Sequence, residues 1–283
     1  MELTYLDAVI LGIVEGITEY LPISSTGHLT ATEKILGLQV DNPSVTGYTA
    51  TIQIGAIAAT LVFFWSKIFR LAKAFFAGLF HAEARASHDW TLGLAVIFGS
   101  LPVGIIGYFA RHLISGPLRS LTVVAMGLIL WSLVMWLAEE KYARSVREGK
   151  ERAEDDVTIM DGVIIGCMQC FSLIPGVSRS GATISAGLFR NVNRVIATEL
   201  SFFMAIPALT AAGLYGLVDV DFKVVPIGPM VVGIIVSFVV AYASIAWLLK
   251  FVANNSLMAF IYYRIPAGVI LAAAVGFGFI SPT

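Results

Sequence analysis

Long apolar stretches, separated by short polar segments, follow one another along most of the chain. A helix that crosses a membrane needs about 20 mostly apolar residues. Six stretches meet this requirement, at residues 48–65, 91–110, 118–138, 197–217, 227–249 and 257–280. The pattern therefore predicts a bundle of membrane-spanning helices.

Two further apolar stretches, 5–31 and 160–187, are long enough to cross a membrane but contain residues that break helices. Each has a proline followed by a cluster of Ser, Thr and Gly, namely LPISSTGH and IPGVSRSGAT. Non-helical backbone at membrane depth persists only where protein buries it or where it lines a water-filled cavity. We therefore predict two re-entrant helix–loop–helix hairpins instead of simple spans.

The two broken stretches also align with each other. With residue 7 placed on residue 161, DAVILGIVEGITEYLPISSTG faces DGVIIGCMQCFSLIPGVSRSG without a gap, and six of the 21 positions are identical. Three predicted spans follow each stretch, and an odd number of crossings inverts the second half relative to the first. The predicted fold class is an all-α integral membrane protein with two inverted-topology repeats, each a re-entrant helix-loop-helix hairpin followed by three transmembrane helices. We expect a single membrane domain over 1–283, with repeat halves at 1–150 and 157–283 and a cytoplasmic linker at about 139–156.

Composition agrees with this interpretation. Hydrophobic residues make up 58% of the chain and charged residues 13%, whereas soluble domains carry about 25% charged residues. The net charge of −1 indicates neither a nucleic acid nor an acidic partner. Cys167 and Cys170 form a C-x-x-C pair, which would suit redox chemistry or half of a metal site. Because there is no second pair and no nearby histidine, packing in a helix is the favoured interpretation.

The distribution of positive charge predicts the orientation. If each hairpin returns to the side from which it enters, 13 of the 18 Lys and Arg residues fall on one side and four on the other, with Arg179 in the second hairpin. The positive-inside rule then places the larger group in the cytoplasm and both termini outside. The larger group is Lys67, Arg70, Lys73, Arg85, Lys141, Arg144, Arg147, Lys150, Arg152, Arg190, Arg194, Lys250 and Arg264, and the smaller is Lys34, Arg111, Arg119 and Lys223.

Two carboxylates lie in the first hairpin. Glu15 and Glu19 are four residues apart, so they share one face of a helix. Ionisable groups inside a membrane are costly and usually functional. This pair could hold a divalent cation, act as a general base or orient a histidine. The alternative is an acidic pair solvated at the membrane surface.

The string Ser24, Ser25, Thr26, Gly27 and His28 follows directly. Its hydroxyl and N–H groups could surround an anion, and the N-terminus of a helix that restarts there would add a favourable dipole. His28 would be within reach of Ser25 in a tight loop, and a serine near a histidine and a carboxylate is the outline of an activated nucleophile. The alternative is an ordinary helix cap.

The second hairpin contains Ser178, Arg179, Ser180 and Thr183 around a glycine. The planar guanidinium binds phosphate or carboxylate in a bidentate manner, so the segment suits an oxyanion-binding loop. The alternatives are an arginine that reaches the membrane surface, or one that forms a salt bridge with the acidic pair of the first hairpin. If the hairpins pack face to face, the combined groups suit phosphoryl transfer.

Both motifs resemble family signatures. E-G-I-T-E-Y-L-P-I-S-S-T-G-H at 15–28 and P-G-V-S-R-S-G-A-T at 175–183 are similar to the two signatures of bacterial undecaprenyl-diphosphate phosphatases of the bacitracin-resistance type. The resemblance implies an integral membrane hydrolase that converts undecaprenyl diphosphate to undecaprenyl phosphate and inorganic phosphate, which recycles the lipid carrier for peptidoglycan synthesis. It also implies a multi-pass protein of the bacterial inner (plasma) membrane whose site opens to the outer face, and dependence on Mg²⁺ or Ca²⁺.

The motif match implies roles for particular residues. It assigns catalysis to Glu15, Glu19, Ser25, His28 and Arg179. It assigns substrate binding to Ser24, Thr26, Gly27, Ser178, Ser180 and Thr183, and metal binding to Glu15 and Glu19. The expected partners are the lipid substrate and the bilayer, and the oligomeric state stays open, with a homodimer as one candidate.

A second class of function remains open at this point. Inverted repeats with broken helices are also the architecture of secondary transporters. The same site could therefore belong to a flippase that moves a polyprenyl phosphate across the membrane.

Overall fold

The computed structural model describes residues 2–115, 118 and 120–281, and across them the chain is helical. Arg119, one of the cations in the charge argument, lies outside the described residues. Short 3₁₀ turns occur at Ala82–Ala86, Glu154–Asp156 and Cys170–Leu173. The α-helices within the described ranges are α1 (Tyr5–Thr18), α2 (Ser25–Ile35), α3 (Pro43–Phe63), α4 (Trp65–Phe80), α5 (His88–Ser115), α6 (Leu121–Arg147), α7 (Ile159–Gln169), α8 (Arg179–Phe189), α9 (Arg194–Val218), α10 (Ile227–Asn254) and α11 (Met258–Gly276).

Six of these helices are long and apolar enough to cross a membrane, namely α3, α5, α6, α9, α10 and α11. They correspond to the six predicted spans, so the all-α membrane class is confirmed. α6 continues past residue 138, where the predicted third span ends, as far as Arg147. Glu139 is buried there and accepts hydrogen bonds from Arg194 (2.8 and 3.1 Å) and from the Leu257 N–H (2.7 Å). Glu139, the first residue of the predicted linker, is therefore paired inside the bundle.

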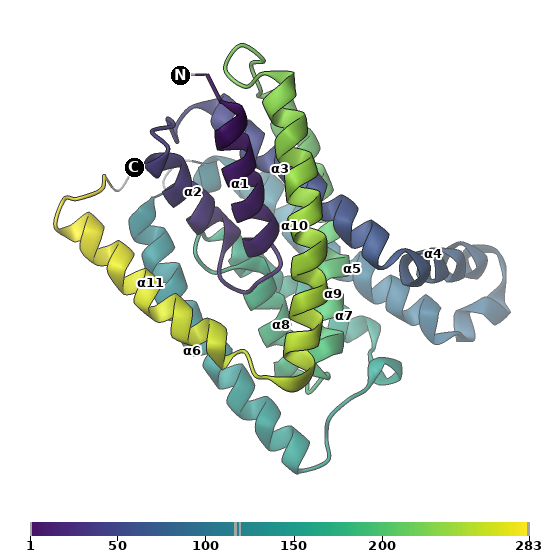
Figure 1. Ribbon diagram of the computed structural model, residues 1–283. Coiled ribbons are helices and arrows are strands. Elements are labelled where there is room, and N and C mark those ends of the chain that lie inside the picture. The colour runs from purple at the N-terminus through teal and green to yellow at the C-terminus, as the bar shows by residue number, and fades with distance from the viewer. Residues whose placement is uncertain (1, 116–117, 119, 282–283) are drawn as a thin grey trace.

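α4 lies between two predicted spans and had no counterpart in the sequence prediction. Its exposed apolar side chains include Trp65, Phe69, Phe76 and Phe80. It packs against α5, and it projects to the right of the bundle in Figure 1. α4 is thus an amphipathic helix added to the first half of the chain.

Both broken stretches form a helix, a break and a second helix, as predicted. α1 and α7 each begin with a reciprocal capping box, made by Thr4 with Asp7 and by Thr158 with Asp161. α2 and α8 each follow a serine in the left-handed region, with φ of 76° at Ser24 and 75° at Ser178. Non-glycine residues seldom adopt this conformation, and it is typical of functional loops.

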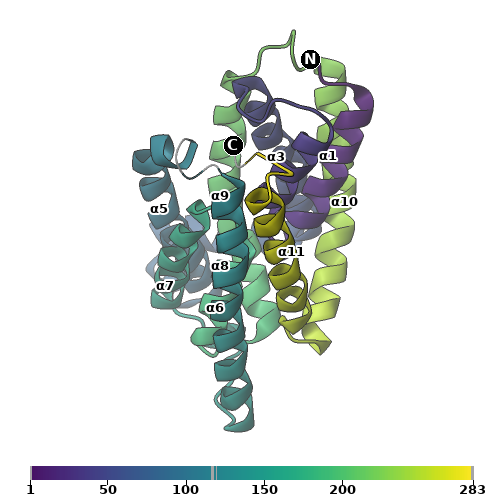
Figure 2. The ribbon, with the colours of Figure 1, turned by 90° about the vertical axis from the view of Figure 1, so that its left-hand side faces the viewer.

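Each of these first helices packs closely on a long helix from the other half of the chain. α1 runs along α10 in Figure 1, and α7 runs along α5 in Figure 2. A Cβ atom on Gly12 would lie 2.8 Å from the Gly233 carbonyl oxygen, and one on Gly166 would lie 1.9 Å from that of Gly99. Small residues that let helix backbones approach are a common device of membrane proteins. The chain thereby holds both breaks at fixed positions.

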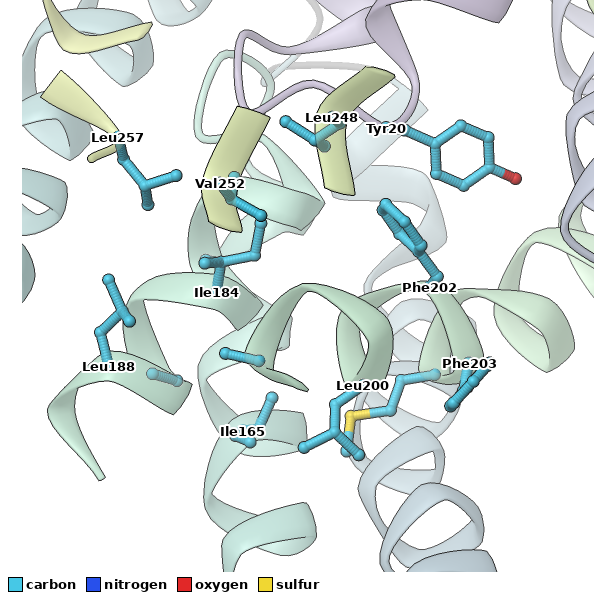
Figure 3. Close-up of a cluster of buried hydrophobic side chains, with 14 of the residues drawn as sticks. Tyr20, Ile165, Ile184, Leu188, Leu200, Phe202, Phe203, Leu248, Val252 and Leu257 are labelled. Atoms are coloured by element: carbon cyan, nitrogen blue, oxygen red, sulfur yellow. The ribbon is translucent and has the colours of Figure 1, made fainter. Parts of the chain in front are cut away.

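The buried core reaches the first break. The Tyr20 ring meets Phe202 edge to face, with ring centroids 4.8 Å apart, as Figure 3 shows. The Tyr20 hydroxyl donates to the Ala56 carbonyl at 2.6 Å and lies 2.5 Å from the Thr60 hydroxyl. A buried aromatic with a satisfied hydroxyl is a strong anchor. Tyr20 therefore fixes the loop that begins at Glu19.

Candidate active site

The two breaks meet in space, as predicted for hairpins that pack face to face. Nη2 of Arg179 lies 3.3 Å from Oε1 of Glu19 and 3.3 Å from the Glu19 carbonyl oxygen. The Ser180 hydroxyl donates to the Leu21 carbonyl at 3.1 Å. An arginine, a carboxylate and several hydroxyl groups are thereby gathered at one place.

Ser25 is the first residue of α2, and its hydroxyl donates to Oε2 of Glu19 at 2.7 Å. Ser25 is half-buried, whereas Glu19 is buried. Hydrogen bonds to an ionised carboxylate are short and strong. Because this bond points the hydroxyl proton at a carboxylate oxygen, Glu19 is placed to accept that proton.

The guanidinium of Arg179 has partners on both of its sides. Nη1 donates to the carbonyl (2.7 Å) and the hydroxyl (3.2 Å) of Ser201, while Nε lies 3.4 Å from Oε1 of Glu19. The contacts with Ser201 include the shorter bond, and those with Glu19 are long. An incoming phosphate oxygen can therefore replace Glu19 while Ser201 continues to hold the guanidinium.

Thr183 takes a supporting position. It is fully buried, and its hydroxyl donates to the Arg179 carbonyl at 2.9 Å and lies 2.7 Å from the Ser201 hydroxyl. It orients the residue that holds Arg179. Ser201 was absent from the sequence prediction, although a serine within an apolar span was the available signal.

Ser178 and Ser180 shape the second loop. The Gly181 N–H donates to the Ser178 hydroxyl at 3.2 Å, which caps α8, and the two serine hydroxyls lie 3.1 Å apart. Both serines are buried. The positive end of the α8 dipole consequently lies beside Arg179.

In the first loop the predicted substrate-binding residues differ in access. Ser24 is buried and precedes α2 without a side-chain cap, whereas Thr26 is exposed. Gly27 is confined, since a Cβ there would lie 2.7 Å from Cγ1 of Val124 on α6. Thr26 and Ser25 are thus the accessible hydroxyl groups of this loop.

The sequence hypothesis expected His28 to reach Ser25, but the ring makes its hydrogen bonds elsewhere. Its Nδ1 lies 2.8 Å from the Ser24 carbonyl oxygen, and its Nε2 lies 2.6 Å from the Tyr263 hydroxyl. The imidazole stacks on the Tyr263 ring, with centroids 5.7 Å apart. Nδ1 is occupied because the ring folds back onto a carbonyl one helical turn earlier, and Nε2 is occupied by a residue of α11.

Glu15 lies one turn before Glu19 and is fully buried. Neither of its carboxylate oxygens has a hydrogen-bond partner among the described residues. The alternative of a solvated surface pair is therefore wrong. A buried carboxylate without a partner calls for a bound cation or a proton. Within the described ranges, no three His, Cys, Asp or Glu side chains gather into a metal site, so the two glutamates would need non-acidic oxygen ligands beside them.

Arg264 does not belong with the cytoplasmic cations. It was counted with the cytoplasmic cations, but it lies in α11 and is completely buried. Its guanidinium donates to backbone carbonyls of both loops, at Pro22 (3.0 Å) and Gly176 (2.9 Å). Its remaining bonds go to Val177 (3.1 Å), Gly127 (3.2 Å) and the Ser132 hydroxyl (3.1 Å). Without Arg264, the larger charge group has 12 of the 18 cations.

Comparison with known proteins decides the family. The family model described as "Bacitracin resistance protein BacA" matches residues 8–270. The chain belongs to this family. A protein named undecaprenyl-diphosphatase from Cutibacterium acnes is 48% identical over 96% of this chain and 98% of its own length. Proteins named undecaprenyl-diphosphatase 1 from Frankia alni and Streptomyces avermitilis are 51% and 50% identical, each over 97% of both chains.

Membership in the BacA family confirms the resemblance that the two motifs indicated. The matched region includes both loops, the acidic pair of α1 and the Arg264 position on α11. Glu19, Ser25 and Arg179 therefore all lie within the matched region.

Proposed function

We infer that this protein is an undecaprenyl-diphosphatase, a membrane hydrolase that converts undecaprenyl diphosphate to undecaprenyl phosphate and inorganic phosphate. The lipid carrier is thereby recycled for peptidoglycan synthesis. The same activity would account for bacitracin resistance, the property after which the family is named. The observation that carries this inference is the contact of Glu19 with both the Ser25 hydroxyl and the Arg179 guanidinium. A carboxylate that holds a potential nucleophile and an arginine together suits phosphoryl transfer.

Phosphate binding falls to the second loop and the start of α2. Arg179 offers Nε and Nη2 to the terminal phosphate in place of Glu19, and Ser201 keeps Nη1 fixed. The N-termini of α2 and α8 both begin at this site, and helix N-termini attract anions. The exposed Thr26 hydroxyl supplies a further donor.

The proposed chemistry begins with the bond from Ser25 to Glu19. Glu19 accepts the hydroxyl proton, and Oγ of Ser25 bonds to the terminal phosphorus while the bond from phosphorus to the bridging oxygen breaks. Undecaprenyl phosphate departs as an anion. Water then attacks the phosphoserine, which releases inorganic phosphate and restores Ser25. An alternative route, in which Ser25 instead positions a water for direct attack, uses the same two residues.

The acidic pair fits a divalent cation, because carboxylate oxygens are the ligands that Mg²⁺ and Ca²⁺ prefer and no donor among the described residues reaches either oxygen of Glu15. Glu15 and Glu19 would hold the ion. When bound, it would neutralise negative charge on the phosphate oxygens.

Two inverted repeats with re-entrant hairpins are the architecture that we propose. In support, the capping threonines Thr4 and Thr158 and the left-handed serines Ser24 and Ser178 both obey the 154-residue offset found in the sequence. The packing is reciprocal, since α1 packs on α10 of the second half and α7 packs on α5 of the first. α3 packs on α9, and α6 packs on α11, so these pairs also join a helix of the first half to a helix of the second.

We propose that the protein lies in the bacterial inner membrane with its site open to the outer face. In support, α1 begins and α11 ends at the same end of the molecule in both ribbon views, while the linker after α6 lies at the opposite end. That linker and the end of α6 carry Arg144, Arg147, Lys150 and Arg152. The positive-inside rule assigns such a segment to the cytoplasm.

A flippase is the competing function, because the proposed repeats are also found in transporters. Phosphate release in detergent separates the two, since there is no membrane to cross. We expect the purified protein to release inorganic phosphate from undecaprenyl diphosphate, and EDTA or Arg179→Ala to abolish this release. A folded wild-type protein that releases no phosphate with any divalent cation would favour the flippase.

A further inference from the structure

The imidazole of His28 is held from two sides by partners with different hydrogen-bonding abilities. The Ser24 carbonyl oxygen, 2.8 Å from Nδ1, can only accept, so Nδ1 carries the hydrogen. In the neutral ring Nε2 is then the acceptor, and the Tyr263 hydroxyl at 2.6 Å donates to it. The two contacts together select one tautomer of the ring.

We propose that Tyr263 is a positioning residue for His28. Its hydroxyl keeps Nε2 unprotonated and turned away from Ser25 in the resting site, and it releases Nε2, as a hydrogen-bond acceptor, to a water when the diphosphate binds. The proposal rests on the proposed phosphatase function, and it adds a residue of α11 to the site.

The surroundings of Tyr263 suit this task. Its ring stacks on the imidazole at an interplanar angle of 18°, so ring stacking aligns the pair in addition to the hydrogen bond. Tyr263 is 46% exposed, which leaves space for its hydroxyl to move aside. The next residue, Arg264, is fully buried and bonded to both loops. The backbone of α11 is therefore fixed at this point, and the movement is confined to the tyrosine side chain.

The test uses Tyr263→Phe, which keeps the stacking ring and removes only the hydroxyl. Tyr262→Phe is the matched control, because it makes the same change at the neighbouring, 68% exposed residue. The full-length protein in detergent is labelled with ¹⁵N-histidine, and His28→Gln assigns the His28 signals among the four histidines. Turnover of undecaprenyl diphosphate is measured in the same samples.

We expect wild-type His28 to be protonated at Nδ1 and unprotonated at Nε2. Tyr263→Phe should shift the Nε2 resonance and lower kcat about fivefold with little change in KM, which corresponds to the loss of one hydrogen bond. Tyr262→Phe should leave both measurements at wild-type values.

Unchanged His28 resonances in Tyr263→Phe would overturn the proposal, whether or not activity fell. A shifted Nε2 resonance with wild-type kcat would also overturn it, because the contact would then not serve the reaction. If wild-type protein itself released no phosphate while Tyr263→Phe still shifted Nε2, the fault would lie in the proposed function and not in the contact.

Discussion

Arg179 at the start of α8 donates to Glu19 at the end of α1, with Nη2 and Oε1 3.3 Å apart although the two residues are separated by 160 positions in the sequence. Glu19 also accepts from Ser25 at 2.7 Å. One carboxylate thus joins the hydroxyl of the first loop to the cation of the second. When a phosphate takes over the guanidinium, the Glu19 carboxylate gives up its contact with Arg179 and keeps its contact with the Ser25 hydroxyl.

Arg179→Lys should have much lower phosphatase activity than the wild type, although it keeps the positive charge. Lysine cannot bond Ser201 and a phosphate through one planar fork. We expect kcat/KM for undecaprenyl diphosphate to fall about 100-fold in Arg179→Lys and further in Arg179→Ala, as for the loss of a preorganised donor. Phosphate release by purified protein measures this.

Arg147→Ala is the matched control, since it removes an exposed arginine at the end of α6. Its kcat/KM should equal that of the wild type. An Arg179→Lys enzyme with wild-type kcat/KM would contradict the bidentate role.

Ser25→Ala should abolish turnover, with a loss of about 1,000-fold or more if its oxygen is the nucleophile. Thr26→Ala removes the neighbouring exposed hydroxyl and should cost about tenfold, because only a binding contact is lost. Rapid quenching with substrate labelled in the terminal phosphate should trap label on the wild-type protein. A Ser25→Ala enzyme that retains most activity while Glu19→Gln loses it would favour direct attack by water.

Glu15→Gln should weaken the response to divalent cations. The substitution keeps the volume of the side chain and removes the charge of the buried, unpartnered carboxylate. We expect the concentration of Mg²⁺ or Ca²⁺ for half-maximal activity to rise about tenfold, while activity at saturating cation changes less. Binding of Ca²⁺ followed by calorimetry, without substrate, gives a reading that does not depend on activity. Wild-type cation dependence in Glu15→Gln would show that the carboxylate needs only a proton.

Arg264→Met should destabilise the whole protein. It leaves the carbonyls of Pro22, Gly176 and Val177 buried without donors, and each such group costs about 1–3 kcal/mol. We expect Tm in detergent to fall by several degrees, with activity lost because the loops separate. Lys223→Met, at an exposed position, should leave Tm unchanged. Equal Tm values for the two variants would show that Arg264 does not clamp the loops.

The sequence predicted the spans and the breaks because these depend on local properties, the apolar length and the helix-breaking residues. It also offered a salt bridge from Arg179 to the acidic pair, since a membrane arginine needs an acceptor, but it left the choice between Glu15 and Glu19 open. It counted Arg264 with the cytoplasmic cations because counting charges by segment does not consider whether an arginine within a span is buried. The partner of His28 was out of reach too, because Tyr263 approaches only through the packing of α11, 235 residues later.

Gly166→Ala should disrupt the packing of α7 on α5. Its Cβ would lie 1.9 Å from the Gly99 carbonyl oxygen, a backbone atom that cannot turn aside as a flexible side chain could. The helices would have to separate, which moves the second loop and Arg179 with it. We expect lower yield, a lower Tm and lost turnover. Gly104→Ala on α5 is the control, because a Cβ there meets nothing within 4 Å. Alanine also favours helix over glycine by about 1 kcal/mol, so this variant should be as stable as the wild type or slightly more so. If Gly166→Ala matched Gly104→Ala in both Tm and turnover, close backbone contact would not be what positions the second loop.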